Sequence, residues 1–479
     1  MKYLLLLFLI SFVISARPVD PTPIDQQIIT LTFNEQYDQA KKLCQKQINL
    51  NPGSPKYYYY LINTKILEYY QRVAELDPGK RDEGRKTLNK EIIDYCENVI
   101  DRIDEFKLSL ENKFYSGTIH AYLARVYGVD ASWWSAFKSG KKAKSIMEEI
   151  VNVDPQFYDA YLVLGMLGYY ADRMSGITSF IAGVLGFSGD REKGLAQLQL
   201  AYEKGKLTFG QSALTLIEIY TSLEGNEYAA LPYFENFLNR FPKNKRTLNA
   251  YCQTLMNIWE IKRAENIIKN DKDSLIDDFA KARLYDLKGN SELAIQYGER
   301  ALQNEKKLFR GGGAASRFIV VFNSWLTRDN ARIKKHETAL NERYQEAFSA
   351  VKRYEKESKW LHELSVRIAL DKEISEIENL LKTKPEFTPE NGFEDQLNLL
   401  IGAFYFKINS YDKAEQSFNK SIAAVNERDK YTAVKYLIEI YMRHSADKVK
   451  VKKLIDVIDN LENTRLSYRS KDLEKKYKL

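Results

Sequence analysis

Cysteine and histidine, the residues that most often hold metals or attack substrates, are scarce in this sequence. Its 479 residues include three cysteines and four histidines, which form no CxxC pair and no HExxH motif. An odd number of widely spaced cysteines (Cys44, Cys96 and Cys252) argues against a disulfide framework and against a zinc site. A phosphate loop and a nucleophile elbow are also missing. The sequence therefore predicts no metal, no cofactor and no enzymatic activity, and each cysteine is expected to be a small buried residue.

Glycine and proline, which are common in tight turns and at the ends of strands, are also infrequent, with 23 and 11 residues. The long segments between them are rich in Lys, Glu, Leu, Ala and Ile, a composition that favours helices. The glycine run at 311–313 interrupts this pattern without the lysine of a phosphate loop, so it predicts a hinge. The loop-like segment at 384–392 (KPEFTPENG) is a second interruption. We expect a Gly-rich hinge and irregular helical section at 311–390, in which 331–358 is a long polar helical stretch.

A strong excess of charge of either sign is absent. The chain has 72 basic and 65 acidic residues, a formal net charge of +7, and the basic residues are spread along most of its length. Nucleic-acid-binding proteins concentrate Lys and Arg on one face, so no nucleic-acid partner is predicted. A basic tail at 464–479 also contains Asp472 and Glu474. This mixture is typical of a solvated tail, and an anionic partner is the alternative.

Long apolar runs are missing except near the N-terminus. There Lys2 precedes the apolar run Leu4–Ile14, and Ser15-Ala16 offers a small-residue cleavage site, which together form a secretory signal pattern. The run is too short to cross a membrane, which takes about 20 residues, and a retained anchor is the alternative. We predict a signal peptide at 1–16, an extended leader at 17–24 and an exported protein, periplasmic or extracellular, with at most peripheral membrane contact.

Against these absences, the sequence repeats one pattern of helix pairs. A tetratricopeptide repeat is a helix–turn–helix of about 34 residues, in which small residues let the two helices approach and large apolar residues fill the space between neighbours. The best match is 395–428, with Gly402 and Ala414 as small residues and Tyr405 and Phe418 as large ones. Further matches place similar residues at the same offsets: Ala40 and Cys44 within 21–54, Ala143 and Met147, Gly165, Ala230 and Phe234, and Ala282 and Ala294.

Several matches at the same offsets predict an array of repeats. Each repeat buries a face by stacking on its neighbours, so poorly matching helix pairs between the anchors are expected. We predict an all-α fold of tetratricopeptide-type repeats, stacked as a right-handed superhelix (an α-solenoid) with a concave inner surface. Its sections are an N-terminal array at 25–310, the irregular section at 311–390 and C-terminal repeats at 391–463.

The middle of the chain, from about residue 120 to 245, carries more specific features. They include Trp134, the tripeptide Val153-Asp154-Pro155 and the stretch GFSGDREKGL at 186–195. In these residues the segment resembles a group of exported bacterial tetratricopeptide repeat proteins of uncertain function. The resemblance implies the repeat fold and export. It implies no enzymatic activity, because the group itself resembles scaffold or binding proteins.

An apolar insertion at 173–189 separates two helices of this segment. Its apolar residues recur at intervals of three and four, which predicts a short amphipathic helix. Such a helix can act as a lid, a membrane-surface contact or a partner helix. A plug packed into the superhelix is the favoured interpretation, because an exposed apolar patch of this size is a liability. Asp190 or Ser188 is the expected N-cap of the next helix.

Aromatic residues are abundant, with 32 Tyr, 23 Phe and 5 Trp. Most of them, including Trp134, Tyr161, Tyr285 and Tyr405, are expected to pack between repeats. The four consecutive tyrosines at 57–60 cover every direction around a helix, so some of them are expected to face solvent or the groove. The candidate partner contacts are Tyr58, Tyr59, Tyr169, Tyr170, Arg173, Ile177 and Phe180.

These features favour a protein that holds other molecules. We predict a non-enzymatic interaction scaffold of the periplasm or cell envelope, which binds protein partners, such as envelope-assembly components, through the concave face. The alternative is a carrier or receptor for a small ligand or glycan, with groove aromatics as the binding surface and the 173–189 segment as a lid. An enzyme would need convergent acids or histidines in a cleft. The partner and the oligomeric state do not follow from the sequence.

Overall fold

The fold is all-α in the part of the chain that the structure describes. The computed structural model describes residues 20–76, 80–103, 109–172, 189–305, 308, 311–387, 393–422, 427–460 and 474. Within these ranges every regular element is a helix and no strand is formed. Successive helices pack as neighbouring pairs, as in α5 with α6 and α21 with α22. The predicted all-α helical-repeat solenoid is therefore confirmed.

The chain divides into two compact units. The first comprises residues 1–67 and 86–212, and the second comprises residues 68–85 and 213–479. The predicted section boundaries at 311 and 391 fall within the second unit and remain predictions.

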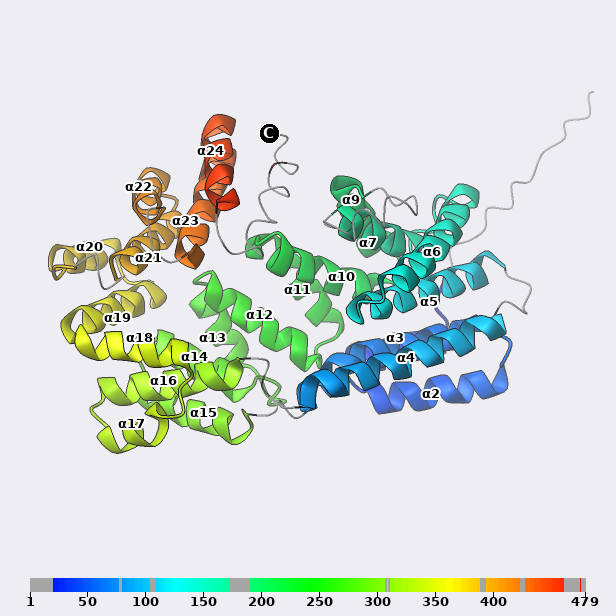
Figure 1. Cartoon of the computed structure of the whole chain (residues 1–479), viewed down its shortest axis with the longest axis horizontal. Helices are drawn as coiled ribbons and strands as arrows, with labels where there is room; N and C mark the ends of the chain where they lie inside the picture. Colours follow the sequence, from blue (N-terminus) through cyan, green and yellow to red (C-terminus); the bar gives the residue numbers. More distant parts are fainter. Residues whose placement is uncertain are drawn as a thin grey trace, which may run out of the picture. The chain divides into compact units, whose positions relative to one another are not determined.

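The helices that begin in the first unit are α1 (Pro23–Phe33), α2 (Tyr37–Leu50), α3 (Pro55–Glu75), α5 (Leu110–Val129), α6 (Trp133–Val153), α7 (Ala160–Asp172), α9 (Arg191–Lys204) and α10 (Phe209–Glu218). Helix α4 (Arg81–Ile103) begins in the second unit and runs into the first. Helices α5 and α6 form a hairpin, and α7 and α9 lie side by side (Figure 1).

The remaining elements belong to the second unit. They are η2 (Ile219–Leu223), α11 (Glu227–Arg240), α12 (Lys245–Asn257), α13 (Ile261–Lys269), α14 (Asp278–Leu287), α15 (Ser291–Gln303), α16 (Gly312–Leu326), α17 (Asn330–Glu337), α18 (Glu342–Arg353), α19 (Glu355–Ala369), α20 (Ile374–Lys382), α21 (Phe393–Lys407), α22 (Tyr411–Ser421), α23 (Glu427–Ile440), η5 (Tyr441–Ser445) and α24 (Lys448–Asp459).

Many helices begin at a polar side chain that accepts a hydrogen bond from the first turn. Asp190 caps α9 in this way, as predicted, with its Oδ1 2.9 Å from the backbone nitrogen of Lys193. Asn, Asp, Ser and Thr are favoured there because their side chains satisfy backbone N–H groups that have no partner inside the helix. The same arrangement recurs at Thr22, Ser109, Asn226, Asn244, Asp277, Asn290, Asp329, Asn341 and Asp447.

The small residues of the repeat pattern lie where two helices approach most closely. A Cβ atom at Gly402 of α21 would lie 2.6 Å from Cε1 of Phe418 on α22. At Gly165 of α7 it would lie 2.8 Å from the carbonyl oxygen of Gly194 on α9. Contacts under 3.0 Å are essentially never made by real Cβ atoms. Glycine therefore sets the interhelical distance in both pairs, as the repeat pattern predicts.

The residues predicted to face the repeat core are buried. The alanines Ala40, Ala143, Ala230 and Ala414 have no exposed surface. All three cysteines are free thiols in the core, as expected. Burial raises the pKa of each thiol to about 12, so none of them is a thiolate near neutral pH.

Two expectations for the region after residue 310 differ from the structure. Gly312 and Gly313 belong to the first turn of α16, so these glycines start a helix, and Gly311 supplies the positive φ of 91° just before it. The polar stretch 331–358 is not continuous, because Asn341 caps a new helix and the backbone leaves the helical conformation again at Tyr354. Its residues are divided among α17, α18 and the start of α19.

Several predicted segments lie outside the described residues. They are the signal peptide at 1–16, most of the insertion at 173–189 including Ser188, and almost all of the basic tail at 464–479. The export signal and the insertion therefore remain predictions. Among the described helices, none combines the length and the apolar character that crossing a membrane requires.

Candidate functional site

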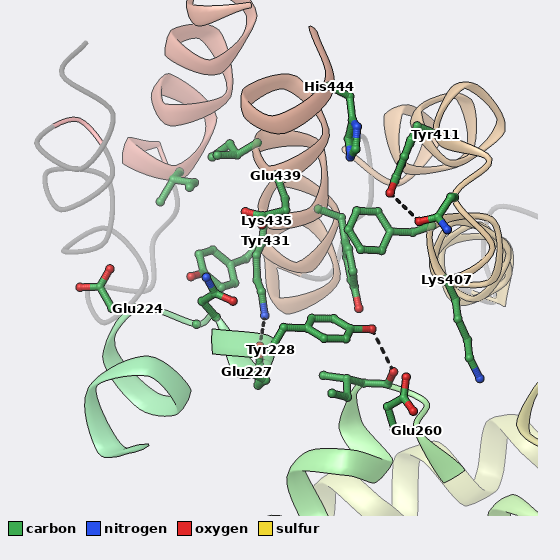
Figure 2. Close-up of a pocket in the computed structure, with 18 residues that line it drawn as sticks. Glu224, Glu227, Tyr228, Glu260, Lys407, Tyr411, Tyr431, Lys435, Glu439 and His444 are labelled. Atoms are coloured by element: carbon green, nitrogen blue, oxygen red, sulfur yellow. Dashed lines mark hydrogen bonds and ion pairs between the residues drawn. The ribbon is translucent and has the colours of Figure 1, made fainter. Parts of the chain in front are cut away.

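A cavity of about 310 Å³ lies within the second unit, between two stretches that are far apart in the sequence. One stretch is 224–260, which contributes the turn before α11 and the turn between α12 and α13. The other is 406–458, which contributes the α21–α22 turn and one face of α23. Figure 2 shows these residues converging from separate helices. We call this space the aromatic cavity.

Helix ends place most of its side chains. Gly225, with a φ of 60°, connects η2 to α11, and Asn226 caps α11 by accepting from the backbone nitrogen of Ala229 at 3.2 Å. Asn409 adopts a φ of 59° between α21 and α22. Gly and Asn adopt the left-handed backbone conformation at lower cost than other residues, so the local sequence favours these two turns. They direct Tyr228 and Tyr411 toward the cavity.

The lining is rich in aromatic rings. Tyr228, which is 38% exposed, donates its hydroxyl proton to the carbonyl oxygen of Ile258 at 3.3 Å. Phe406 meets Tyr436 edge to face at a centroid distance of 5.1 Å, and Tyr411 stacks on His444 at 3.5 Å. Burial raises the pKa of Tyr228 to about 12, so its hydroxyl is neutral near pH 7. The rings offer π faces and neutral hydroxyl groups.

Carboxylates outnumber ammonium groups around these rings. Glu224, Glu227, Glu260 and Glu439 line the cavity together with Lys407 and Lys435. Lys435 reaches down from α23 to Glu227, 2.5 Å away (Figure 2). Lys407 points away from the tyrosines (Figure 2), to Asp371 at 2.5 Å and to the carbonyl oxygen of Trp259 at 2.9 Å. Both lysines are therefore already engaged by acceptors, and the lining has a formal charge of −2 from four carboxylates and two ammonium groups.

A broader hollow of about 470 Å³ adjoins the cavity, and Tyr436 lines both. Its lining comes from α16, α18, α19, α21 and α23 and from the end of α12. We call it the apolar hollow, because side chains such as Phe318, Phe322, Leu361 and Leu400 dominate it. His362 also lines the hollow, and burial lowers the pKa of this histidine, which favours the neutral form. The cavity and the hollow together form a surface with an acidic aromatic end and an apolar end.

The tyrosines predicted to contact a partner are mostly in the core, which corrects the prediction. Tyr58, Tyr59 and Tyr169 are 3%, 2% and 0% exposed. Of the four consecutive tyrosines at 57–60, Tyr57 is partly exposed and the other three are buried, because α3 packs against several helices. Tyr59 contacts Phe114 and Tyr122 of α5, and α3 also bonds α1 through Thr32 and Thr64.

The other predicted contacts divide into two groups. Tyr170 is partly exposed and its ring meets Tyr169 edge to face at 5.4 Å. Arg173, Ile177 and Phe180 lie outside the described residues. None of the four described residues, Tyr58, Tyr59, Tyr169 and Tyr170, lines the aromatic cavity or the apolar hollow.

Four tyrosine and tryptophan residues were expected to pack between repeats. Tyr405 is buried, Tyr161 and Tyr285 are partly buried, and Tyr285 stacks on Tyr297 at 5.5 Å. Trp134 is different, because 62% of it is exposed. The packing role expected of Trp134 is therefore wrong.

The sequence held one signal for the aromatic cavity. Tyr431, Lys435 and Glu439 recur at intervals of four and so share one face of α23. An aromatic, a cation and an anion in line on one face differ from the apolar stripe of a packing helix. The cavity-lining residues of 224–260 show no comparable sequence pattern. Their proximity to α23 depends on how the repeats stack.

Comparisons with known proteins identify no family for this chain. No family model matches the chain, and no curated protein matches it. Among solved structures, the human IFIT1 dimer with m7Gppp-AAAA is 13% identical, with a TM-score of 0.26, covering 94% of this chain and 93% of that one. The APC/C hetero-tetramer Cut9–Hcn1 is 11% identical, with a TM-score of 0.22, covering 94% of this chain and 95% of that one. At such low scores, the fold assignment depends on the helices themselves.

Proposed function

We propose that this protein is a non-enzymatic interaction scaffold whose second unit holds a segment of a protein partner. The observation that supports it is the aromatic cavity, with its excess of carboxylates, next to the apolar hollow. A segment with a basic side chain beside apolar residues complements both parts. The basic side chain enters the cavity and the apolar residues cover the hollow.

Cation recognition follows from the chemistry of the lining. A lysine or arginine over the face of an aromatic ring gains about 0.5–2 kcal/mol, and more where water is excluded. The rings of Tyr228, Tyr411 and Phe406 offer such faces, and Glu260 and Glu439 supply the charge. Ligand pockets usually span about 300–1,000 Å³. A cavity of about 310 Å³ is at the lower end of that range, which suits one long side chain better than a whole drug-sized ligand.

A carrier of a small cationic ligand is the second candidate. It is favoured by the same cavity, since tyrosine rings and carboxylates also recognise free amines. The apolar hollow argues for the protein segment, because a small amine would leave that surface uncovered. Neither candidate function rests on the predicted lid at 173–189, since the described residues that line the cavity all belong to the second unit.

We propose that the protein acts outside the cytoplasm of a bacterium. The signal pattern in 1–16 and the resemblance of the middle segment support that setting. An envelope-assembly component as the partner is part of the same proposal.

The experiment is a binding titration with peptides that differ at one position. Labelled peptides with Lys, Arg, Gln or norleucine between apolar residues are titrated with the full chain by fluorescence anisotropy. We expect Lys and Arg peptides to bind at least about tenfold more tightly than the Gln and norleucine peptides. Equal affinities for all four peptides would contradict cation recognition.

A charge-matched pair of variants locates the binding. Glu260→Gln with Glu439→Gln should reduce the preference for Lys about tenfold, because the cation loses its counter-charges. Glu292→Gln with Glu386→Gln, which removes two exposed charges from the same unit, should leave the preference unchanged. If spermidine or tetramethylammonium binds as tightly as the Lys peptide, the small-ligand carrier replaces the scaffold.

A further inference from the structure

An exposed apolar cluster lies in the first unit, at the turn between α5 and α6. Val129, Trp133 and Trp134 are 47%, 37% and 62% exposed. Nine large hydrophobic residues of the described ranges are exposed, and these three come from the single segment 129–134. The other six are scattered along the chain. Single exposed apolar residues are ordinary, whereas a cluster that contains two tryptophans marks a contact surface.

The local backbone directs Trp134 away from the core. Helix α5 ends at Val129, Ala131 takes a left-handed φ of 58°, and Trp133 and Trp134 are the first two residues of α6. The face of α6 that packs inward is occupied by Phe137, Gly140, Ala143, Met147 and Ile150, all of them buried. At 100° per residue, Trp134 points nearly opposite to that face.

The face of α6 that carries Trp134 is basic. Lys138 and Lys141 follow Trp134 at intervals of four and three, and Lys142 lies beside them; all three are exposed. No acidic residue occurs between Trp133 and Met147. This tryptophan-and-lysine surface, comprising Val129, Trp133, Trp134, Lys138, Lys141 and Lys142, therefore combines apolar area with concentrated positive charge.

Within the part of the chain that the structure describes, no carboxylate forms an ion pair with these three lysines. Lys144 pairs with Glu148 at 3.8 Å, one turn further along α6. Asp130 in the turn accepts hydrogen bonds from Asn89 at 3.4 Å and from Ser132 at 3.3 Å. The positive charge of Lys138, Lys141 and Lys142 is thus available to an anionic surface.

We propose that this surface binds an anionic lipid surface. Tryptophan is favoured at the membrane interface, because its ring is apolar while its N–H group stays hydrogen-bonded to water or headgroups. Lysines place their chains along the apolar boundary and their ammonium groups among the phosphates. In this arrangement the 129–134 turn enters the interface to a depth of about 5–10 Å, and α6 presents its lysines to the headgroups.

This inference is independent of the proposed function. It involves residues of the first unit alone, whereas the aromatic cavity is lined by residues of the second. It also differs from the predicted membrane contact at 173–189, which lies outside the described residues. The charge pattern favours lipid headgroups over a protein groove, because three exposed lysines beside tryptophan, none of them in an ion pair with a described residue, suit a flat anionic layer.

The experiment measures partition of the full chain between water and lipid vesicles. Vesicles of equal parts phosphatidylglycerol and phosphatidylcholine are compared with pure phosphatidylcholine by sedimentation. The apolar run at 4–14 contributes equally to every variant, so differences between variants report on the tested surface. We expect Trp133→Ser with Trp134→Ser to weaken binding to anionic vesicles on the order of tenfold or more. Ile374→Ser with Val449→Ser, a change at two exposed apolar residues elsewhere, should have no effect.

The lysines are tested separately. Lys138→Gln, Lys141→Gln and Lys142→Gln together should weaken binding about fivefold per lysine and remove most of its salt dependence. Lys420→Gln, Lys452→Gln and Lys453→Gln, three exposed lysines of the second unit, form the charge-matched control. Equal loss in both triple variants would show that net charge, and not this surface, drives binding.

Fluorescence quenching by brominated lipids shows where the tryptophans are. The wild-type chain should lose emission in brominated anionic vesicles, and the variant with both serines should not. Binding that is unchanged in the Trp133→Ser, Trp134→Ser variant overturns the proposal. So does a wild-type chain that binds neither vesicle type but loses a crosslinked protein partner in that variant, since the surface would then be a protein contact.

Discussion

In the first unit the tyrosines of α3 pack against α5, whereas in the second unit the tyrosines of α11, α22 and α23 line a cavity. Tyr59 touches Phe114, Tyr115 and Tyr122, and its ring is nearly enclosed. Tyr228 is 38% exposed at the start of α11. Tyr59 lies near the start of α3, as Tyr228 and Tyr411 lie at the start of α11 and α22, but the rings of α5 pack over Tyr59. Local density of aromatic residues therefore does not locate a binding surface; whether other helices pack over each ring does.

The largest difference between the α3 tyrosines and the cavity tyrosines should be the loss of stability when an enclosed ring is truncated. Tyr59→Ala should lower the free energy of unfolding by about 3–5 kcal/mol, because it leaves a cavity among Phe114, Tyr115 and Tyr122. Tyr228→Ala should lower it by about 1 kcal/mol or less, since that ring is partly in water. Urea denaturation followed by circular dichroism measures both. Similar losses in the two variants would remove the distinction between the tyrosine groups.

Close helix packing gives the next largest effect, and it should also differ between the units. In the first unit Gly165→Ala places a methyl group 2.8 Å from two backbone atoms, of Gly194 and Leu198, which cannot move independently. In the second unit Gly402→Ala meets the Phe418 ring, a side chain that can shift. We expect a loss of about 3 kcal/mol for Gly165→Ala and about 1–2 kcal/mol for Gly402→Ala.

Gly168→Ala is the matched control on α7. Its Cβ atom would lie 3.5 Å from the carbonyl oxygen of Asp190, an ordinary contact distance. Alanine is the better helix former, so this variant should be as stable as the wild type or up to about 1 kcal/mol more stable. Thermal unfolding of the three variants side by side tests the order, and a Gly168→Ala variant as unstable as Gly165→Ala would contradict the role given to close approach.

Buried carboxylates provide a pH-dependent comparison. In the first unit Asp159 accepts hydrogen bonds from the backbone nitrogens of 206–208 and from the Thr208 hydroxyl. In the second unit Asp286 accepts from Asn323 at 2.6 Å, and loss of solvation raises its pKa to about 6 from 3.8. Between those two pH values the folded state binds a proton that the unfolded state does not, so ionisation of Asp286 reduces stability as the pH rises.

Asp286→Asn should therefore stabilise the protein at pH 7, by about 1–3 kcal/mol, and the gain should disappear below about pH 4. Asp159→Asn should destabilise it at pH 7, because an amide group cannot accept on both sides. Denaturation curves of both variants at several pH values measure the difference. A gain for Asp286→Asn that is the same at pH 4 and pH 7 would rule out the ionisation as its cause.

The parts of the structure that depend on local sequence were predictable. Gly402 with Phe418 and Gly165 with Leu198 identify helix pairs, because each pair of contacts lies within one repeat. The Asp190 cap was readable from its position before a helical stretch. The aromatic cavity was not, because Glu227 and Lys435 are separated by 208 residues and meet through the stacking of many repeats. The exposure of Trp134 was missed because a repeat pattern assigns faces within helices and says little about their first residues.

The smallest predicted effect is a change in peptide affinity when the ring of Tyr228 is replaced. Tyr228→Leu should weaken binding of the Lys peptide about threefold to thirtyfold, because the π face that stabilises the cation is lost. Tyr228→Phe keeps that face and loses only the hydroxyl bond to the carbonyl oxygen of Ile258, so it should bind within about threefold of the wild type. Anisotropy titrations of the two variants measure the ratio. If Phe weakens binding as much as Leu, the hydroxyl and not the ring contacts the ligand, and the cation–π part of the proposed function is wrong.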